Sequence, residues 1–265
     1  AEQHAVSMAA GMARGGYRPY FAVYSTFLQR AYDQIVHDVC LQNLPVCILS
    51  DHVGLVGDDG KTHHGVLSVP MLMSIPNLTL LAPRDTRQIR QAVRATLKLD
   101  GPCVVQYPKE GIEPYAQNVT GEPFAVGKWQ TLIPGGQDAV ILAYGRMTQN
   151  AIQASELLVQ RGLSVGVIDC CSLKPLDMDC LRALFERKAK IVTIEEGEMI
   201  GGFGSEIARV CVEENADAPV QIIGLENRFI THGSVPELLR ECGLTPEQLA
   251  DRIEEIAGDK ENSHV

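Results

Sequence analysis

Several features that would assign this chain of 265 residues to a class at once are missing from it. No apolar stretch is long enough to span a membrane, and no segment repeats with a period of roughly 20–50 residues. The formal net charge is −10, which argues against a nucleic-acid backbone as the main partner. We therefore expect no membrane and no nucleic-acid partner, and an anionic substrate would need a local basic pocket.

Cysteine motifs are also absent. The eight cysteines have no regular spacing and no Cys-x-x-Cys pair, so neither a disulfide framework nor a zinc site is expected. Most of them lie in apolar runs, where a free thiol behaves as a small hydrophobic group. This usage fits a reducing, cytoplasmic compartment. No strand leads into Gly-x-Gly-x-x-Gly, which argues against a nicotinamide-binding domain.

The composition that is present is that of a globular α/β protein. Apolar residues make up 45% of the chain and charged residues 21%, and the length allows two domains. Strand and helix patterns alternate throughout, which predicts two doubly wound domains with mostly parallel sheets. We place these domains at 1–111 and 137–258, a Pro-, Gly- and polar-rich linker at 112–136, and a frayed tail at 259–265. The chain begins with Ala1 inside a helical pattern, which is typical of a piece of a longer protein.

Hydrophobic periodicity predicts the individual elements. In the first domain we expect helices over about 2–14, 25–43, 66–74 and 85–99, and strands over 18–24, 45–51, 78–82 and 103–107. In the second we expect helices over 147–162 and 177–188, another after the glycines at 201–204 and two short ones near the end, with strands over 139–144, 163–169, 190–195 and 220–225. Ser25 and Thr26 are candidates to cap the second helix.

The densest polar chemistry lies in the loop 54–65, which follows a buried-looking strand and is here called the 54–65 loop. It contains four glycines, which let the backbone turn sharply and approach a ligand closely. Between them stand two acids, a lysine, a threonine and two adjacent histidines. Loops that follow strands in α/β sheets are where ligands bind, so we expect this loop to be functional.

Three other sets of residues have ordinary structural interpretations when taken singly. Glu2 lies in the first turn of a helix, where a carboxylate usually acts as a dipole partner. Tyr24, Phe27 and Arg30 are spaced by three, so they share roughly one helical face. His232 has no other candidate site residue beside it, so a structural role is as good an interpretation as a functional one.

In combination these segments indicate a family. Several motifs follow one another along the chain. In order, they are Ala1-Glu2-Gln3-His4-Ala5, the segment 24–34, Asp59-Gly60-Lys61-Thr62-His63-His64-Gly65, Tyr107-Pro108, Glu195-Glu196-Gly197 and the glycine-rich segment 201–205. From Ala1 to about residue 257 the chain resembles the 1-deoxy-D-xylulose-5-phosphate synthases, a thiamine-diphosphate-dependent family of the transketolase superfamily. The long match over 24–34 is the most specific part of this resemblance.

The resemblance implies a cofactor site in the first domain. Glu2 matches the glutamate that hydrogen-bonds the aminopyrimidine ring of thiamine diphosphate and promotes its activation. We expect a partly apolar site to raise the proton affinity of such a carboxylate. Tyr24 and Phe27 match the aromatic wall against which that ring packs.

The resemblance also implies substrate contacts. Arg30 matches a position that touches the substrate region, and His232 one near the substrate entrance. Asp59 and His63 match loop residues that handle the substrate's hydroxyls and proton transfers, work that suits a histidine near neutrality. His64 lies at a position where the family accepts other polar residues.

The implied reaction joins pyruvate to glyceraldehyde 3-phosphate with loss of carbon dioxide, within a homodimer, and its product feeds isoprenoid, thiamine and pyridoxal synthesis. Two positions depart from the family. His52 and Lys109 stand where the family has arginines that are thought to grip the acceptor's phosphate. Lysine is a point charge and histidine is only partly charged, whereas arginine binds phosphate through two parallel hydrogen bonds. A relative that uses another aldehyde acceptor therefore stays open.

The Gly-Asp-Gly motif that holds the cofactor's diphosphate and Mg²⁺ is absent, since Gly57-Asp58-Asp59-Gly60 differs from it. We therefore expect no metal site in this chain and place Mg²⁺ in an upstream domain, together with the first strand of the pyrimidine-binding domain. The chain alone is expected to be inactive. Alternative interpretations are the separate C-terminal subunit of a split transketolase, the beta subunit of a 2-oxo acid dehydrogenase, and a non-catalytic assembly module.

Overall fold

A computed structural model describes residues 1–111 and 124–258, so the expected tail and residues 112–123 of the expected linker lie outside the described residues. The first sheet has the order β1 (Tyr20–Tyr24), β2 (Cys47–Asp51), β4 (Cys103–Gln106), β3 (Thr79–Leu81) and β8 (Ser172–Lys174). The second has the order β10 (Val220–Leu225), β9 (Ile191–Glu198), β6 (Ala139–Ala143), β7 (Val165–Asp169) and β5 (Gln130–Ile133). Each sheet is parallel except for one antiparallel edge strand, β8 or β5.

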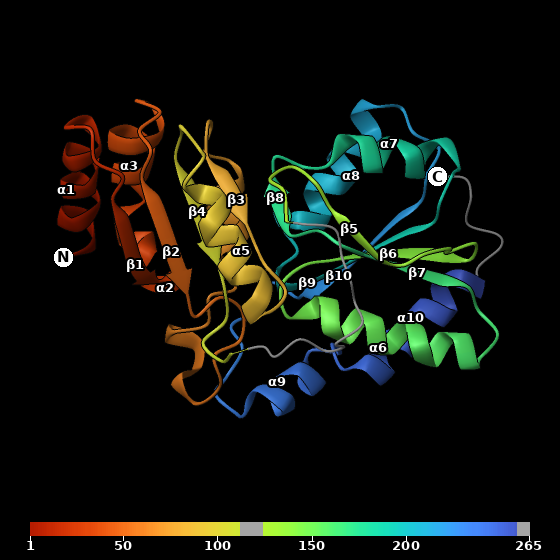
Figure 1. Ribbon diagram of the computed structural model, residues 1–265. Coiled ribbons are helices and arrows are strands. Elements are labelled where there is room, and N and C mark those ends of the chain that lie inside the picture. The colour runs from red at the N-terminus through yellow and green to blue at the C-terminus, as the bar shows by residue number, and fades with distance from the viewer. Residues whose placement is uncertain (112–123, 259–265) are drawn as a thin grey trace.

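Helices surround both sheets. Those of the first half are α1 (Glu2–Arg14), α2 (Ser25–Leu28), α3 (Tyr32–Gln34), α4 (Ser68–Met73) and α5 (Thr86–Thr96), with the 3₁₀ segments η1 (Gln29–Ala31) and η3 (Gly57–Thr62) and the π-helical segment η2 (Ile35–Cys40). Those of the second half are α6 (Met147–Gln160), α7 (Met178–Glu186), α8 (Phe203–Glu213), α9 (Val235–Glu241) and α10 (Pro246–Gly258). In Figure 1, α7 and α8 cover one face of the second sheet, while α6 and α10 cover the other. None of the described helices is long and apolar enough to cross a membrane.

Local sequence explains where these elements form. The strands β6, β7 and β9 are buried along their whole length. The strands β6 and β7 are the nearly continuous apolar runs expected in a parallel sheet covered on both faces, whereas β9 also buries three glutamates. Asp85 caps α5 by accepting the N–H of Gln88 at 2.7 Å, and Ser234 with Glu237 forms a capping box at α9. The prediction of an α/β protein with two doubly wound, mostly parallel units is confirmed.

Three local predictions were wrong. Residues 130–133, expected to be linker, form the edge strand β5 of the second sheet. The helix expected over 25–43 is divided into short helical segments, because the backbone leaves the helical region at Ala31. Ser25 is the first helical residue rather than a cap, and its hydroxyl donates to the carbonyl of His52 at 2.9 Å. That hydrogen bond joins α2 to the end of β2.

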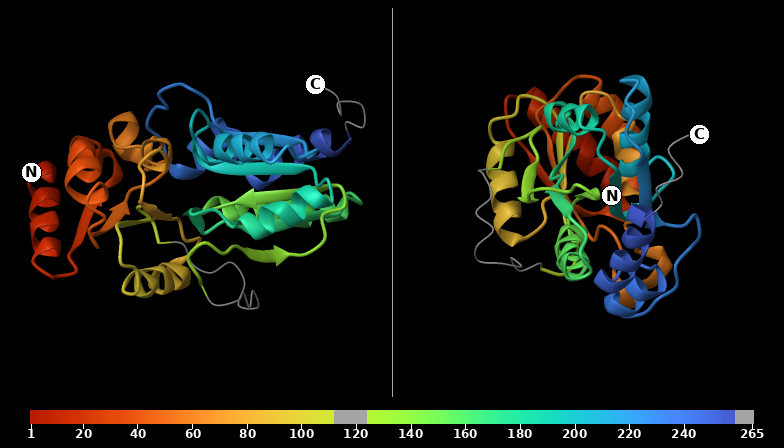
Figure 2. Two further views of the ribbon diagram at one scale, coloured as in Figure 1. Left: turned by 90° about the horizontal axis from the view of Figure 1, so that it is seen from above. Right: turned by 90° about the vertical axis from the view of Figure 1, so that its right-hand side faces the viewer.

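The two sheets meet at the carboxyl ends of their strands. After β3, the N–H of Ala82 donates to the carbonyl of Cys171, and the N–H of Gly145 donates to the carbonyl of Ala82. The strand β8 comes from the second half of the sequence but completes the first sheet. Figure 2 shows α1 at the end of the molecule remote from the second sheet. The loops that leave both sheets therefore gather at the junction between the two halves.

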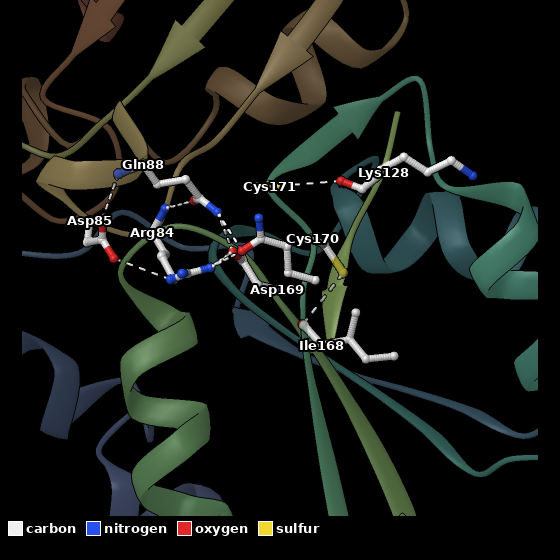
Figure 3. A network of polar contacts seen from close by, with 9 residues as sticks. Arg84, Asp85, Gln88, Lys128, Ile168, Asp169, Cys170 and Cys171 are labelled. Carbon is white, nitrogen blue, oxygen red and sulfur yellow. Dashed lines mark hydrogen bonds and ion pairs between the residues drawn. The ribbon is translucent and has the colours of Figure 1, made fainter. Parts of the chain in front are cut away.

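A buried polar network fixes one part of this junction (Figure 3). Arg84 is paired with Asp169 at the end of β7 and lies 3.3 Å from the carboxylate of Asp85. Gln88, in α5, donates to the same carboxylate of Asp169 at 2.6 Å. Asp169 is fully buried, and desolvation raises the pKa of its carboxyl even though the Arg84 charge opposes that shift. We call Arg84, Gln88 and Asp169 the Arg84–Asp169 network.

Candidate active site

The predicted site residues of the first half gather at the carboxyl ends of three neighbouring strands. Tyr24 ends β1, Asp51 ends β2, and Gln106 ends β4. Because these strands are parallel neighbours, the segments that follow them leave the sheet at the same edge. The 54–65 loop follows β2, and Lys109 follows β4.

Aromatic rings form the centre of this site. The rings of Tyr24 and Phe27 are stacked with their centroids 5.2 Å apart, and the ring of Tyr24 also stacks on His52 at 3.6 Å. Phe27 meets the ring of His63 edge-on at 5.5 Å. Tyr24 ends β1 and Phe27 lies in α2, so the two rings meet across the strand–helix turn rather than on one face of a helix. His52 is 7% exposed, so Tyr24 covers the ring that we expected to reach an acceptor.

Glu2 and Arg30 lie on the outer side of these rings. Arg30 Nη1 is 3.2 Å from Glu2 Oε1, and its guanidinium lies 4.7 Å from the centroid of Phe27. The pKa of the Glu2 carboxyl is lowered, first by a hydrogen bond from its own backbone N–H and to a smaller extent by the charge of Arg30. The sequence-based expectation was a raised proton affinity. In the structure the carboxylate remains hydrogen-bonded and partly exposed, so its charged form is favoured.

Asp59 and Lys109 form an ion pair at the rim of the site. Lys109 Nζ lies 2.5 Å from Asp59 Oδ2, and both side chains are partly exposed. The hydrogen bond from Lys109 lowers the pKa of Asp59, with smaller contributions from His63 and His52, and the same bond raises the pKa of Lys109. Lys109, which we expected to bind the acceptor's phosphate, is therefore already paired with Asp59, which we expected to contact the substrate.

The two adjacent histidines have different surroundings. The hydroxyl of Thr62 lies 2.9 Å from His63 Nδ1 at the partly exposed side of the site. His64 is buried, and its Nδ1 accepts the N–H of Val56 at 3.1 Å. Since that nitrogen is an acceptor, Nε2 carries the proton and donates to the carbonyl of Thr231 at 2.9 Å. His64 is thus a neutral bridge between the two halves of the chain.

The glycines of the 54–65 loop approach the second half of the chain. A Cβ on Gly57 would lie 3.4 Å from the carbonyl oxygen of Gly233, and one on Gly60 would lie 3.2 Å from Cβ of His232. Both glycines have positive φ values, of 77° and 70°. We expected these glycines to let a ligand approach, but the close partner at both positions is the segment before α9. His232 accordingly lies against the 54–65 loop.

A cavity of about 400 Å³ opens beside Phe27, between the 54–65 loop and the segment that follows β10. Its walls include Phe27, Arg30, His64, Leu67, Glu198 and Phe229. Phe229 is 82% exposed and Leu67 is 42% exposed. The site is therefore open on this side and presents apolar surface there.

The residues present fit only one half of thiamine diphosphate. The carboxylate of Glu2 beside the rings of Phe27 and Tyr24 provides a hydrogen-bonding group and an aromatic wall for the aminopyrimidine ring. Within the described parts of the chain, no group of three or more His, Cys, Asp or Glu side chains is arranged to hold a metal ion. The diphosphate and its metal would need donors from another domain.

Comparisons with known proteins place this chain in a family. The model of the transketolase pyrimidine-binding domain matches residues 1–113, and that of the transketolase C-terminal domain matches residues 127–249. The chain therefore belongs to the transketolase superfamily, of which it carries these two domains in this order. Within it, the chain is similar to the 1-deoxy-D-xylulose-5-phosphate synthases of Rippkaea orientalis (41% identical), Shouchella clausii (42%) and Synechococcus elongatus (43%).

The extent of these matches is uneven. The alignments cover 96–98% of this chain but only 40–41% of the relatives, so the chain spans less than half of their length. A solved chain of a split-gene transketolase, described as an inactive beta4 tetramer, superposes with a TM-score of 0.87 at 29% identity over 98% of this chain and 83% of that chain. A transketolase variant from Pichia stipitis superposes with a TM-score of 0.73 at 20% identity, over 93% of this chain and 35% of that chain, which shows the common fold.

Two residues at the site edge escaped the sequence-based analysis. Arg146 follows β6 and Glu196 lies in β9, and together they contact the 54–65 loop. The sequence places Glu196 in the motif Glu195-Glu196-Gly197 but assigns neither Glu196 nor Arg146 a role in the site. The position of both residues near the carboxyl ends of parallel strands was the available signal.

Proposed function

We propose that this chain supplies the pyrimidine-binding and C-terminal domains of a thiamine-diphosphate-dependent synthase. The synthase joins pyruvate to glyceraldehyde 3-phosphate, releases carbon dioxide and yields 1-deoxy-D-xylulose 5-phosphate. The observation that carries the proposal is that Arg30 contacts both Glu2 and Phe27, and that the ring of Phe27 meets the ring of His63. The names of the similar proteins support the choice of reaction.

Each residue has a role that its surroundings support. Glu2 would hydrogen-bond the aminopyrimidine ring, and Phe27 with Tyr24 would pack against that ring and exclude water. When bound, thiamine diphosphate supplies the electron sink for loss of carbon dioxide. His63, partly exposed and hydrogen-bonded to Thr62, would exchange protons with the substrate. Asp59 would orient a substrate hydroxyl.

Both side chains expected to hold the acceptor's phosphate already have partners. Lys109 is paired with Asp59, so a phosphate would compete with that carboxylate. His52 is covered by Tyr24. We therefore propose glyceraldehyde 3-phosphate as the acceptor with a weaker phosphate grip than two arginines would give. Turnover that requires an unphosphorylated aldehyde instead would overturn this choice of acceptor.

The rest of the assembly belongs to the same proposal. A separate domain would hold the diphosphate and Mg²⁺, and two copies would form a homodimer. Isoprenoid, thiamine and pyridoxal precursor synthesis would be the destination of the product. All eight cysteines are free, which fits work in a reducing cytoplasm.

The test measures carbon dioxide release by the whole protein, including its upstream domain, with thiamine diphosphate, Mg²⁺ and pyruvate. We expect release that depends on glyceraldehyde 3-phosphate and falls on the order of 100-fold in Glu2→Ala. Glu247→Ala is the matched control, because Glu247 also lies in the first turn of a helix but far from the site in sequence. Turnover that ignores this acceptor would indicate another aldehyde, and unchanged turnover in Glu2→Ala would overturn the role of Glu2.

A second candidate is the separate C-terminal subunit of a two-chain transketolase. The similarity to the split-gene transketolase favours it, because this chain covers 83% of that solved chain. Mass spectrometry of the native protein separates the two candidates. A polypeptide of the mass of this chain supports the separate subunit, and a polypeptide more than twice as large supports the fused synthase.

A further inference from the structure

The 54–65 loop belongs to the first half of the chain, but a buried ion pair of the second half holds its backbone. Arg146 Nε donates to Glu196 Oε2 at 2.9 Å, and Arg146 Nη2 donates to Glu196 Oε1 at 2.5 Å. Two parallel hydrogen bonds of this kind fix the relative orientation of both groups. The side chains are only 12% and 8% exposed, so solvent screens the pair weakly.

Both groups of this pair also bind the backbone of Leu55. Glu196 Oε1 accepts the N–H of Leu55 at 2.8 Å, and Arg146 Nη2 donates to the carbonyl of Leu55 at 3.0 Å. One residue of the loop therefore has its N–H and its carbonyl bound from the other domain. We call Arg146, Glu196 and Leu55 the Arg146–Glu196 clamp.

The loop is shaped to accept this clamp. A Cβ on Gly54 would lie 2.7–2.9 Å from the carboxylate atoms of Glu196, which is closer than a real Cβ can approach. Gly54 also has a positive φ of 78°, which glycine adopts without strain. The glycine thus permits the carboxylate to lie directly against the backbone.

A second attachment holds the other end of the loop. His64 joins the N–H of Val56 to the carbonyl of Thr231. Asp59 and His63 lie between these two attachments, and His63 is the immediate neighbour of His64. Movement of the backbone at Leu55 or His64 would therefore change the positions of both side chains.

We propose that Arg146 and Glu196 are positioning residues of the active site. They touch Leu55 rather than the expected substrate region, and they hold the loop so that Asp59 meets Lys109 and His63 meets Phe27. The importance of this for turnover rests on the function proposed above for Asp59 and His63. The C-terminal domain then takes part in building a site whose reacting residues all come from the other domain.

The first test is hydrogen exchange followed by mass spectrometry on the full-length protein. Glu196→Gln keeps the shape of the side chain and removes the charge that binds Arg146. We expect the peptide containing Leu55 and Val56 to exchange at least about tenfold faster, as expected for a local opening, while peptides from β6 keep their rates. Arg146→Lys, which keeps the charge but loses the planar fork, guards against a variant that does not fold and should act in the same direction.

Asp169→Asn is the matched control, because it weakens the Arg84–Asp169 network at the same domain junction. It should speed exchange in β7 and leave the 54–65 loop with its wild-type rate. Loop exchange that is unchanged in both clamp variants would overturn the proposal. Loop exchange that rises only in step with that of β6 would overturn it as well, because the effect would then be global.

The second test measures kcat and KM separately for the two clamp variants. A misplaced Asp59 and His63 should lower kcat on the order of 100-fold, with the KM for pyruvate changed much less. Hydrogen exchange needs no turnover, so it tests the clamp even where the proposed reaction is wrong. A freed loop with unchanged kcat would overturn the positioning role while leaving the proposed function intact.

Discussion

The junction between the two halves of this chain contains two buried arginine–carboxylate pairs with different roles. In both, the arginine side chain is 12% exposed. The Arg84–Asp169 network joins side chains of α5 to the end of β7. The Arg146–Glu196 clamp binds the backbone of a loop instead.

The difference shows that the same ion pair can stabilise a fold or place a site. The role of each pair depends on which other groups its two side chains bind. Asp169 is bound by Gln88 as well as Arg84, and every one of these residues belongs to or adjoins a regular element. Glu196 has its other partner in Leu55, which no helix or strand holds. We therefore expect the network to control global stability and the clamp to control local geometry.

The largest expected effect comes from removing the carboxylate of the network. Asp169→Ala leaves the Arg84 guanidinium buried without its main partner, and loss of one member of a buried pair costs about 4 kcal/mol of unfolding free energy. Chemical denaturation measures this cost. Lys188→Ala is the control, because its partner Asp217 lies in an exposed pair and such pairs contribute little. A loss in Asp169→Ala no larger than that in the control would remove the proposed distinction between the two pairs.

The second prediction concerns Glu195, the neighbour of the clamp that faces the interior of the second domain. Its carboxylate accepts the N–H groups of Phe203 and Gly204, yet burial raises the pKa of Glu195 from 4.5 to about 7. Between these pH values the folded chain holds more protons than the unfolded chain. The unfolding free energy should therefore fall as the pH rises from about 4.5 to about 7, by roughly 3 kcal/mol.

Denaturation curves across this pH range check the prediction. Glu195→Gln cannot titrate, so its stability should vary less with pH than that of the wild type. Glu196→Gln is the matched comparison, since it alters the adjacent carboxylate that points to the 54–65 loop. If the pH dependence of the unfolding free energy became equally weak in both variants, the two neighbouring carboxylates would not have separate roles.

The smallest of these effects is expected at the loop itself. Gly54→Ala places a Cβ against the carboxylate of Glu196 and imposes an unfavourable φ of 78°, which should cost about 2 kcal/mol. Gly162→Ala is the control, because Gly162 has a φ of 85° but nothing within 4 Å of the added Cβ. The difference in denaturation midpoint between the two variants isolates the contact with the clamp. No difference would mean that backbone conformation alone accounts for the glycine.

Much of the fold was predictable because its elements are long and periodic. The fully buried strands β6 and β7 are mostly apolar runs whose type can be recognised locally, and β9 begins with such a run over 191–194. The strand β8 was missed because its three residues are too few for a pattern, and its partner β3 lies far away in the sequence. The strand β5 was hidden in a polar stretch, where pairing with β7 overrides weak local preference.

The candidate site divides in the same way. The rings of Tyr24 and Phe27 do lie together, but the helical spacing from which we argued does not apply, because Tyr24 ends β1. The pairing of Lys109 with Asp59 was not predictable, since a charge close to the strand end has several possible partners. The contact between Glu2 and Arg30 likewise depends on how the chain packs in three dimensions, because the two residues are 28 positions apart.

By itself, the sequence determined the α/β class, the order of the two domains and the strand ends at which polar residues gather. These properties follow from periodicity and from motifs that are contiguous along the chain. Only the tertiary structure decided what the glycines of the 54–65 loop approach and which residues hold it. Leu55 and Glu196 are 141 positions apart, and no local pattern encodes a contact at that separation. Such a contact exists only because two independently patterned sheets bring their carboxyl ends together.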